Sequence, residues 1–169
     1  MKDFFYKYIL FVSFLLLFTH CSEPGCMDVI ACNYNSDATE DDGTCEIPLE
    51  NPIEIIYIDD YVSGAVGEDL ISHIYVRNSS CETMTDLIVR KIFTTVPDVT
   101  VYFCFNDICF PSTTITAPNP LTLETFETDD YFKGYLNSDI SGVFEVKYRF
   151  YLQGQPSQSV EVSVTYEVN

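Results

Sequence analysis

The clearest pattern in this chain is the alternation of apolar and polar side chains near its C-terminal end. In residues 142–152, GVFEVKYRFYL, apolar side chains alternate with Glu145, Lys147 and Arg149. Residues 159–168, SVEVSVTYEV, repeat this alternation. A period of two is typical of antiparallel β-strands that bury one face. Both segments are therefore predicted to be half-buried strands.

The same alternation assigns a buried face to each of these two strands. We expect Gly154, Gln155 and Pro156 to form the turn that joins the strands as a hairpin. The side chains predicted to point inward are Phe144, Val146, Tyr148, Phe150 and Leu152 in the first strand, and Val160, Val162, Val164, Tyr166 and Val168 in the second.

Six earlier segments also have the composition of strands, and turn residues separate them roughly every ten positions. They are Ile53–Asp59, Leu70–Asn78, Leu87–Thr94, Val99–Phe105, Leu121–Glu127 and Tyr131–Leu136. None of this region has the 3.6-residue period of an amphipathic helix. About eight short strands with regular turns predict an all-β domain, a β-sandwich over residues 53–169.

The N-terminal residues have a different pattern. Lys2 and Lys7 precede an apolar run from Tyr8 to Phe18, and small and polar residues follow before Cys21. The run is too short to cross about 30 Å of hydrocarbon as a helix. A basic start, a short apolar centre and an early break are typical of an export signal, predicted here for residues 1–20. The alternative is an uncleaved anchor or a buried helix.

Beyond residue 21 the chain is strongly acidic, with six basic against 25 acidic side chains and hence a net charge of −19. Such a charge repels nucleic-acid phosphates and anionic lipid headgroups, so nucleic acid is excluded as a partner. An acidic surface attracts divalent cations and basic partners. It also acts as a solvated coat that keeps exported proteins soluble.

The chain has seven cysteines, which leaves one over if the others pair. Cys21 directly follows the apolar run, and LFTHC resembles the lipobox of bacterial lipoproteins, in which cleavage precedes a lipid-carrying cysteine. The departures are Phe18, where Leu is usual, and His20, where a small residue is usual. The resemblance implies a lipid anchor on Cys21. Otherwise cleavage occurs nearby and Cys21 is a spare thiol.

Residues 25–45, GCMDVIACNYNSDATEDDGTC, resemble a short cysteine-bounded repeat of surface and secreted proteins in Bacteroidetes-type bacteria. The matching residues are Gly25, Cys26, Asp28, Ala31, Asn33, Tyr34, Asn35, Ala38, Asp41, Asp42, Gly43 and Cys45. The resemblance implies a small disulfide-stapled module, residues 21–48, on an exported protein rather than an enzyme. About twenty residues are too few to bury a core, so a Cys26–Cys45 bridge would replace one.

Residues 53–169 resemble an immunoglobulin-like domain of the same bacterial surface proteins. The residues that carry this resemblance are Tyr75, Val76, Arg77, Asn78, Cys104, Cys109, Phe110, Asn119, Pro120, Gly142, Val160 and Val162. The predicted fold is therefore an all-β, Ig-like antiparallel β-sandwich, preceded by the stapled module and a signal peptide.

The remaining cysteines lie in or before this sandwich. Cys104 and Cys109 flank the turn residues Asn106 and Asp107, where a bridge would pin the tip of a hairpin and fix its register. Redox activity usually needs a C-x-x-C motif at a helix N-terminus, which is absent. Two cysteines, Cys32 and Cys81, remain by subtraction, either as a pair or as free thiols.

The N-terminal module is also a candidate metal site. Zinc usually requires closely spaced cysteine pairs with further thiolate or imidazole ligands, and the spacing here does not fit. For calcium, Asn33, Asn35 and Asp37 repeat the 1, 3, 5 spacing of EF-hand donors, and Asp41 and Asp42 follow. The later glycine and glutamate of an EF-hand are absent. Calcium is thus the one candidate cofactor, and solvated side chains with local Asx turns are the alternative.

Catalytic motifs are scarce. His73, the only histidine after residue 21, shares a predicted strand face with Tyr75 and Arg77 and is more typical of a surface residue than of a catalytic base. The chain has no G-x-S-x-G, H-E-x-x-H or glycine-rich phosphate loop. Carboxylates are abundant, so residue types alone do not exclude a glycosidase. A sandwich of this size leaves little room for a substrate cleft, and we expect no enzyme.

Together these patterns predict a non-catalytic, exported cell-surface protein, lipid-anchored at the outer membrane or otherwise secreted. Its Ig-like domain would serve adhesion or interaction with a cell-surface protein or glycan, through loops or an exposed strand edge. The membrane would be contacted through the lipid alone. The alternatives are a structural subunit of a cell-envelope assembly and a carbohydrate-binding module. The candidate sugar-stacking residues are Tyr61, Tyr131, Phe132 and Tyr135.

Overall fold

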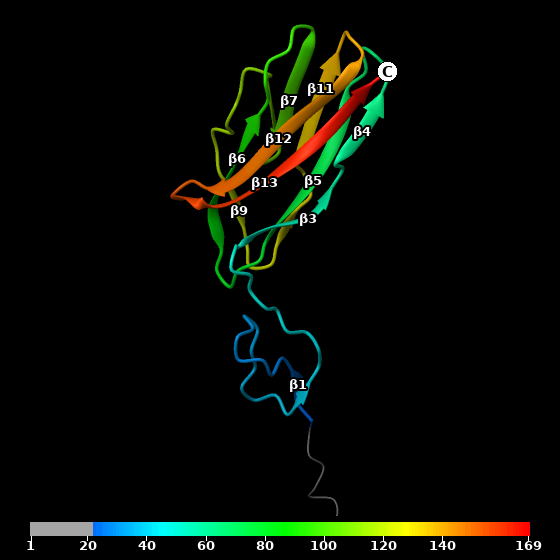
Figure 1. Cartoon of the computed structure of the whole chain (residues 1–169). Helices are drawn as coiled ribbons and strands as arrows, with labels where there is room; N and C mark the ends of the chain where they lie inside the picture. The colour runs from blue at the N-terminus through cyan, green and yellow to red at the C-terminus, as the bar shows by residue number, and fades with distance from the viewer. Residues whose placement is uncertain (1–21) are drawn as a thin grey trace, which may run out of the picture. The chain divides into compact units, whose positions relative to one another are not determined.

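The computed structural model describes residues 22–169, so the predicted signal segment and Cys21 lie outside the described residues. The described chain consists of strands and irregular segments. It contains no helix long and apolar enough to cross a membrane. The chain divides into two compact units: the first ends at Glu46, and the second covers Ile47–Asn169 (Figure 1).

The first unit is held together by turns and a disulfide rather than by a core. Its two short strands, β1 (Pro24–Gly25) and β2 (Glu40–Asp41), pair in parallel. Among residues 22–46, the buried apolar side chains are Cys26 and Ala31. Two such side chains cannot offset the conformational entropy of ordering this many residues.

Beside the disulfide of this unit, the backbone of Gly25 lies against the side chains of Asn35 and Ala38. Cys26 and Cys45 are bonded, with their Cα atoms 4.8 Å apart. A Cβ added at Gly25 would stand 3.0 Å from the side-chain nitrogen Nδ2 of Asn35 and 3.3 Å from the Cβ of Ala38. Glycine, asparagine and alanine at these three motif positions are therefore explained by tight packing of one loop on another.

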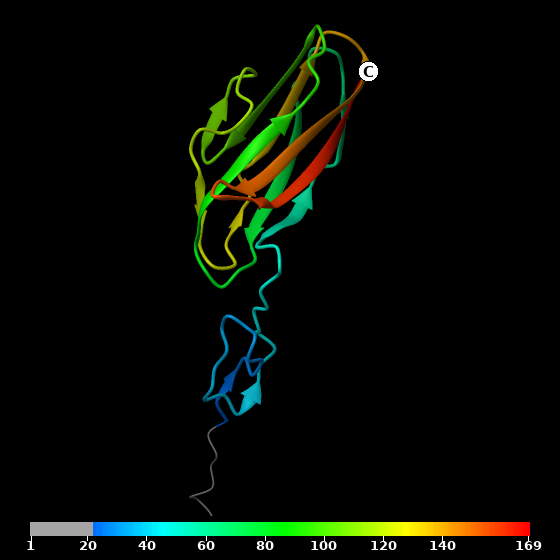
Figure 2. The ribbon, with the colours of Figure 1, turned by 60° about the vertical axis from the view of Figure 1, so that its left-hand side comes forward.

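The second unit consists of two sheets that face each other as a sandwich (Figures 1 and 2). The six-stranded sheet contains β3 (Ile53–Ile58), β5 (Leu70–Asn78), β7 (Val99–Phe105), β8 (Ile108–Phe110), β10 (Thr128–Asp129) and β11 (Lys133–Ser138). The five-stranded sheet contains β4 (Tyr61–Gly64), β6 (Met84–Ile92), β9 (Leu121–Leu123), β12 (Gly142–Leu152) and β13 (Gln155–Val168).

Non-consecutive strands are neighbours in both sheets. The six-stranded sheet has the order β10-β5-β11-β7-β8, and β3 pairs with β5. The five-stranded sheet has the order β4-β13-β12-β6-β9, in which β4 and β13 pair in parallel and the other pairs are antiparallel. This arrangement confirms the predicted all-β, Ig-like sandwich.

The core lies between the two sheets and follows the alternation of the strands. In β12 every second side chain from Val146 to Leu152 is buried, and in β13 the same holds from Val164 to Val168. Phe144, at the start of β12, is half-buried and packs against the core. The predicted inward faces of the C-terminal hairpin are confirmed.

One core side chain spans the layer between the sheets. Tyr148 of β12 is fully buried, and burial raises the pKa of its phenol well above the ordinary value. At Gly134 in β11 an added Cβ would lie 2.4 Å from the Tyr148 hydroxyl oxygen. The ring packs edge-on against Phe132, with centroids 5.0 Å apart. Glycine at position 134 therefore makes room for this phenol.

Several predicted strand boundaries differ from the structure, and the largest differences lie at residues 121–127 and at the turn before β13. The predicted strand 121–127 is shorter: β9 ends at Leu123, and a turn follows in which Phe126 has a φ of 57°. The turn between β12 and β13 lies at residues 153–154, so Gln155 and Pro156 already belong to β13. Leu152 and Gln155 are register partners, which leaves a two-residue turn.

Candidate functional site

All six cysteines in residues 22–169 are disulfide-bonded. The bridges include Cys104–Cys109, next to the turn between β7 and β8, as well as the bridge in the first unit. Cys32 and Cys81 are also bonded, and their pairing with each other stays a prediction. Because disulfides persist in oxidising compartments, they indicate an extracytoplasmic protein. Cys21, the predicted lipid attachment residue, lies outside the described residues.

The side chains predicted as calcium donors bond mainly to the nearby backbone. The bonds join Asn35 to the N–H of Asp37, Asp41 to the N–H of Gly43, Asp42 to the N–H of Thr44, and Asn33 to the carbonyl of Thr44 and the N–H of Glu46. The bonds of Asn35, Asp41 and Asp42 are those of local Asx turns, whereas Asn33 ties its own loop to the segment around Cys45. Within residues 22–169 no group of three or more His, Cys, Asp or Glu side chains is placed to hold a metal ion.

The outer face of the six-stranded sheet carries a cluster of tyrosines. Alternate residues of a strand point to the same face, and four neighbouring strands each contribute aromatic side chains here. We call this surface the tyrosine face; it consists of Tyr57 in β3, Tyr75 in β5, Tyr102 in β7, Tyr135 in β11 and Tyr131 just before β11.

Register places these rings in pairs. Tyr102 and Tyr135 are partners on adjacent strands, and their rings stack with centroids 4.5 Å apart and planes 5° apart. Tyr57 and Tyr75 are also partners, with centroids 4.7 Å apart. Partial burial and, second, the nearby Asp69 raise the pKa of Tyr102 to about 12.

Polar groups lie between the two ring pairs. His73 of β5 and Lys133 of β11 are register partners, and both are half-buried. The Lys133 ammonium nitrogen stands 5.7 Å from the centroid of the Tyr131 ring, a cation–π distance. The tyrosine face therefore combines flat aromatic rings with hydroxyl, imidazole and ammonium donors.

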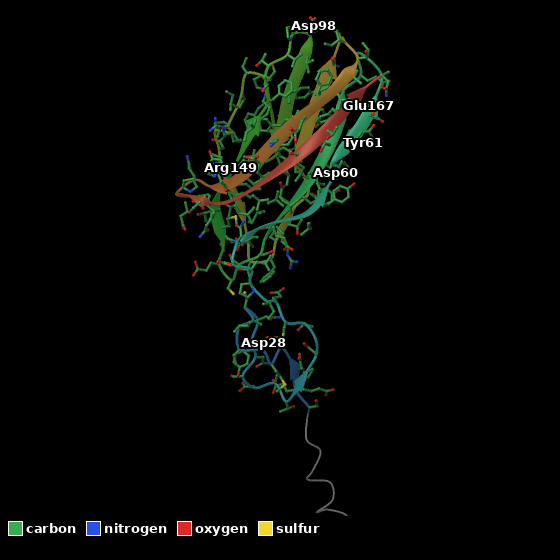
Figure 3. The ribbon with its side chains drawn as sticks, viewed as in Figure 1. Asp28, Asp60, Tyr61, Asp98, Arg149 and Glu167 are labelled. Atoms are coloured by element: carbon green, nitrogen blue, oxygen red, sulfur yellow. A yellow bond between two sulfur atoms is a disulfide. The ribbon has the colours of Figure 1, made fainter. Side chains whose placement is uncertain are left out.

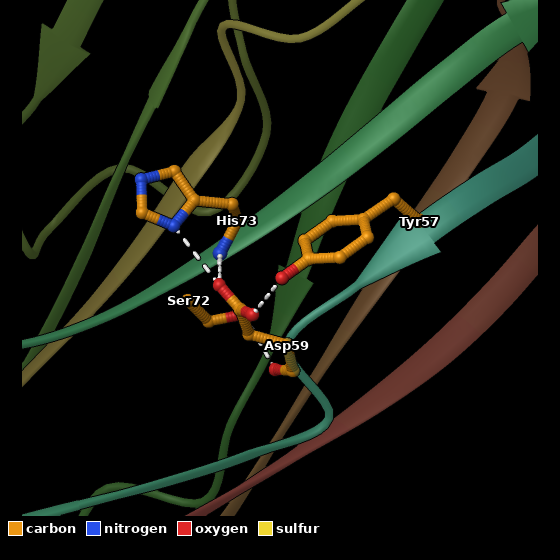
Figure 4. Close-up of polar contacts among 4 residues, drawn as sticks. All are labelled: Tyr57, Asp59, Ser72 and His73. Carbon is orange, nitrogen blue, oxygen red and sulfur yellow. Dashed lines mark hydrogen bonds and ion pairs between the residues drawn. The ribbon is translucent and has the colours of Figure 1, made fainter.

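The edge of the tyrosine face holds a polar cluster around Asp59, the residue after β3 (Figure 4). Its carboxylate accepts a hydrogen bond from the Tyr57 hydroxyl and another from the backbone N–H of His73. The Nδ1 atom of His73 lies 2.9 Å from the same carboxylate. Burial by itself would raise the pKa of Asp59, but these hydrogen bonds outweigh it and hold the pKa below its usual value.

The Asp59–His73 pair resembles part of a catalytic triad, but the neighbouring serine is not placed to complete one. Ser72 precedes His73 in β5 and therefore points to the opposite face of the sheet, where it is fully buried in the core. Its hydroxyl donates to the backbone carbonyl of Asp59 (Figure 4). The cluster thus ties the end of β3 to β5 and orients the Tyr57 and His73 rings.

The predicted sugar-stacking residues do not form one platform. Tyr131 and Tyr135 belong to the tyrosine face, whereas Phe132 is fully buried in the core. Tyr61 belongs to β4 of the other sheet, and its hydroxyl donates to Glu167 of β13, beside it in Figure 3. Sequence reasoning missed the other three tyrosines of the face, because only strand pairing shows that their strands are neighbours.

Comparisons with known proteins bear on the fold alone. No protein-family model matches the chain, and a search of curated proteins found no relative. Among solved structures, the N-terminal domain of PorA matches with a TM-score of 0.50 and 13% identity, over 69% of this chain and 96% of that one.

Two further structures are more distant. A conjugative transposon lipoprotein from Bacteroides eggerthii has a TM-score of 0.42 and 11% identity, over 68% of this chain and 93% of that one. A PapD-like domain of human CEP192 has a TM-score of 0.39 and 13% identity, over 70% and 86%.

Proposed function

We propose that this chain is a non-catalytic, exported cell-surface protein whose sandwich domain binds a partner through the tyrosine face. The observation that carries the proposal is the pairing of tyrosine rings across neighbouring strands of a rigid sheet. Tyrosine is enriched in protein interfaces and their hot spots, because its ring offers apolar area and its hydroxyl a directional bond. Tyr57 is 46% exposed, so part of this area is open to a partner.

The proposed partner is a protein on the cell surface. The Asp59 cluster and the stacked pair Tyr102–Tyr135 hold the rings in place before binding, which lowers the entropy lost on association. A glycan is the second candidate, since flat, half-exposed rings also stack on sugars. If the protein is instead a structural subunit of an envelope assembly, the tyrosine face would form a permanent interface with another subunit.

In this proposal the chain is held at the outer membrane by lipid on Cys21, and the disulfide-stapled unit serves as a spacer. The sequence LFTHC after the apolar run supports the lipid. Mass spectrometry of the membrane fraction should show a chain that begins at an acylated Cys21, and Cys21→Ala should release the protein from that fraction. A soluble wild-type product that starts at another residue would contradict the anchor.

The binding face is tested with the full mature protein on intact cells and on a glycan array. The double variant Tyr57→Ala/Tyr135→Ala should weaken binding at least tenfold, whereas Tyr61→Ala, on the other sheet, should bind as the wild type does. Equal binding by the double variant would refute the face. Specific binding to one glycan that the double variant loses would assign the face to sugar recognition instead.

A further inference from the structure

A groove opens between the two sheets beside β6 and β7. Its volume is about 500 Å³, within the size range of small-molecule sites. The end of β6 from Arg90 onward forms one side, the start of β7 at residues 99–101 forms the other, and residues 112–115 lie along it. Since β8 pairs with β7 only from Phe103 onward, no strand in residues 22–169 covers this part of that β7 edge.

A buried lysine lies in this groove. Lys91 is 7% exposed, and its Nζ donates to the backbone carbonyls of Val101, at 2.6 Å, and Ser112, at 2.8 Å. These bonds use two of the three N–H groups of an ammonium. No carboxylate in the described part of the chain forms an ion pair with Lys91.

The absence of a counter-charge is costly for the free protein. A buried charge destabilises the fold unless it is paired, and burial accordingly lowers the pKa of the Lys91 amine. Two carbonyl oxygens supply partial negative charge but not a full one. An anion in the groove would therefore gain an unusually favourable partner.

The rest of the groove lining complements such an anion. Although 25 acidic residues follow residue 21, no Asp or Glu belongs to the lining. Besides Lys91, the polar residues of the lining are Arg90, Thr95, Thr100, Ser112 and Thr113. Its apolar residues are Ile92, Phe93, Val99, Val101 and Ile115.

We propose that this groove binds a small organic carboxylate with an apolar body, and that the carboxylate pairs with Lys91. The carboxylate accepts the third N–H of the ammonium and bonds to lining hydroxyls, while the body contacts the apolar side chains. Both parts of the ligand are needed, because the lining combines the buried Lys91 ammonium with apolar residues. The tyrosine face takes no part, so this site stands apart from the proposed function.

The experiment is an NMR titration of the full mature protein with hexanoate at constant ionic strength. Hexanoate should shift amide signals of residues 90–93, 99–101 and 112–115. Hexanamide, which keeps the body but loses the charge, should bind at least tenfold more weakly, and so should acetate, which keeps the charge but loses the body. If hexanamide binds as tightly as hexanoate, or if hexanoate shifts no signals in these segments, the proposal is wrong.

Two variants distinguish a specific role of Lys91 in hexanoate binding from the general effect of removing one positive charge. Lys91→Met keeps the length of the side chain and should lose at least tenfold in hexanoate affinity, whereas Lys147→Met, which removes an exposed lysine on β12, should not change it. Unchanged affinity in Lys91→Met refutes the pairing.

A second variant avoids the buried position, in case Lys91→Met fails to fold. Ile115 is 55% exposed at the mouth of the groove, so Ile115→Glu should fold and repel a carboxylate, with a loss of at least tenfold in hexanoate affinity. Ile108→Glu is the control and should bind normally, because Ile108 is an exposed residue of β8 beside Phe105, at the end of β7 opposite to Val99. Equal affinity in both variants would overturn the site.

Discussion

At the scale of single residues, the contact between Gly134 and Tyr148 links the two sheets. The Tyr148 ring fills the space above the Gly134 backbone, and any side chain at position 134 would displace it. Protein cores are close-packed, so a displaced aromatic ring forces its neighbours to move as well. The glycine is therefore required by packing rather than by backbone conformation.

This contact predicts the effect of Gly134→Ala. The new methyl group would stand 2.4 Å from the Tyr148 hydroxyl oxygen, and overpacking of this kind costs about 1–3 kcal/mol of unfolding free energy. Urea denaturation measures the loss. Gly154→Ala is the control, because its Cβ meets nothing closer than 3.6 Å and should leave stability within about 0.5 kcal/mol of the wild type. Equal stability of the two variants would contradict the packing argument.

A second prediction at the scale of single residues concerns Asp59 and the pH dependence of folding stability. Its pKa is lowered in the folded protein, so it contributes stability at pH above its unfolded value near 3.8, and this contribution is lost as pH falls. In Asp59→Asn the fall in melting temperature between pH 6 and pH 3 should be smaller than in the wild type. Asp60→Asn, the exposed neighbour, serves as the control, and a wild-type pH profile in Asp59→Asn would show that the hydrogen bonds have no net effect.

At the scale of elements, the hairpin of β7 and β8 combines a specific turn with a disulfide. Asn106 and Asp107 have φ values of 51° and 59°, and a two-residue type I′ turn requires positive φ at both positions. Asparagine and aspartate tolerate this conformation better than other non-glycine residues. The bridge between Cys104 and Cys109, which are register partners, then fixes the pairing.

The turn geometry predicts opposite outcomes for two substitutions at one position. Asp107→Val places a β-branched residue at a φ of 59° and should cost about 1–2 kcal/mol of stability. Asp107→Gly removes the steric conflict and should leave stability equal or slightly higher. Thermal denaturation of both variants with the disulfide intact measures the difference. If the valine variant is as stable as the glycine variant, the turn does not have this conformation in solution.

At the scale of the whole molecule, the two units differ in what stabilises each of them. The second unit has a continuous core between two sheets, whereas the first has two buried apolar side chains, a bridge that closes 19 residues and the bonded Cys32. On the chain-entropy model, a loop of this size gives about 3 kcal/mol through the unfolded state. The Cys26–Cys45 bridge is therefore expected to be a major source of stability for the first unit.

The contrast predicts an uneven response to loss of the bridge. In Cys26→Ser/Cys45→Ser, amides of residues 22–46 should lose their protection from hydrogen exchange, because the unit has no core that could order them without this bridge. Amides of β12 and β13 should keep wild-type protection, since their stability comes from the sandwich core. Hydrogen exchange with mass spectrometry resolves the two regions. Retained protection in residues 22–46 would show that local hydrogen bonds and the bonded Cys32 suffice without the Cys26–Cys45 bridge.

The sequence by itself determined the features that depend on neighbouring residues. The alternation in residues 142–152 specifies a strand and its buried face, since successive side chains of a strand point to opposite sides. Asn106 and Asp107 indicate a turn because they accept positive φ. The cysteines and short length of the first unit likewise indicate a stapled module, since a core of that size cannot form.

Only the tertiary structure decided which of these elements meet. The tyrosine face depends on β5 lying between β3 and β11, and on β11 lying beside β7, pairings that no local pattern contains. Sequence reasoning therefore found Tyr131 and Tyr135 but placed the buried Phe132 with them. No local pattern marks Lys91 as buried; its burial depends on β7, whose Val101 carbonyl accepts a hydrogen bond from the Lys91 ammonium. Such contacts are selected by how the whole chain buries its apolar surface, and that is a property of the assembled sheets rather than of any one segment.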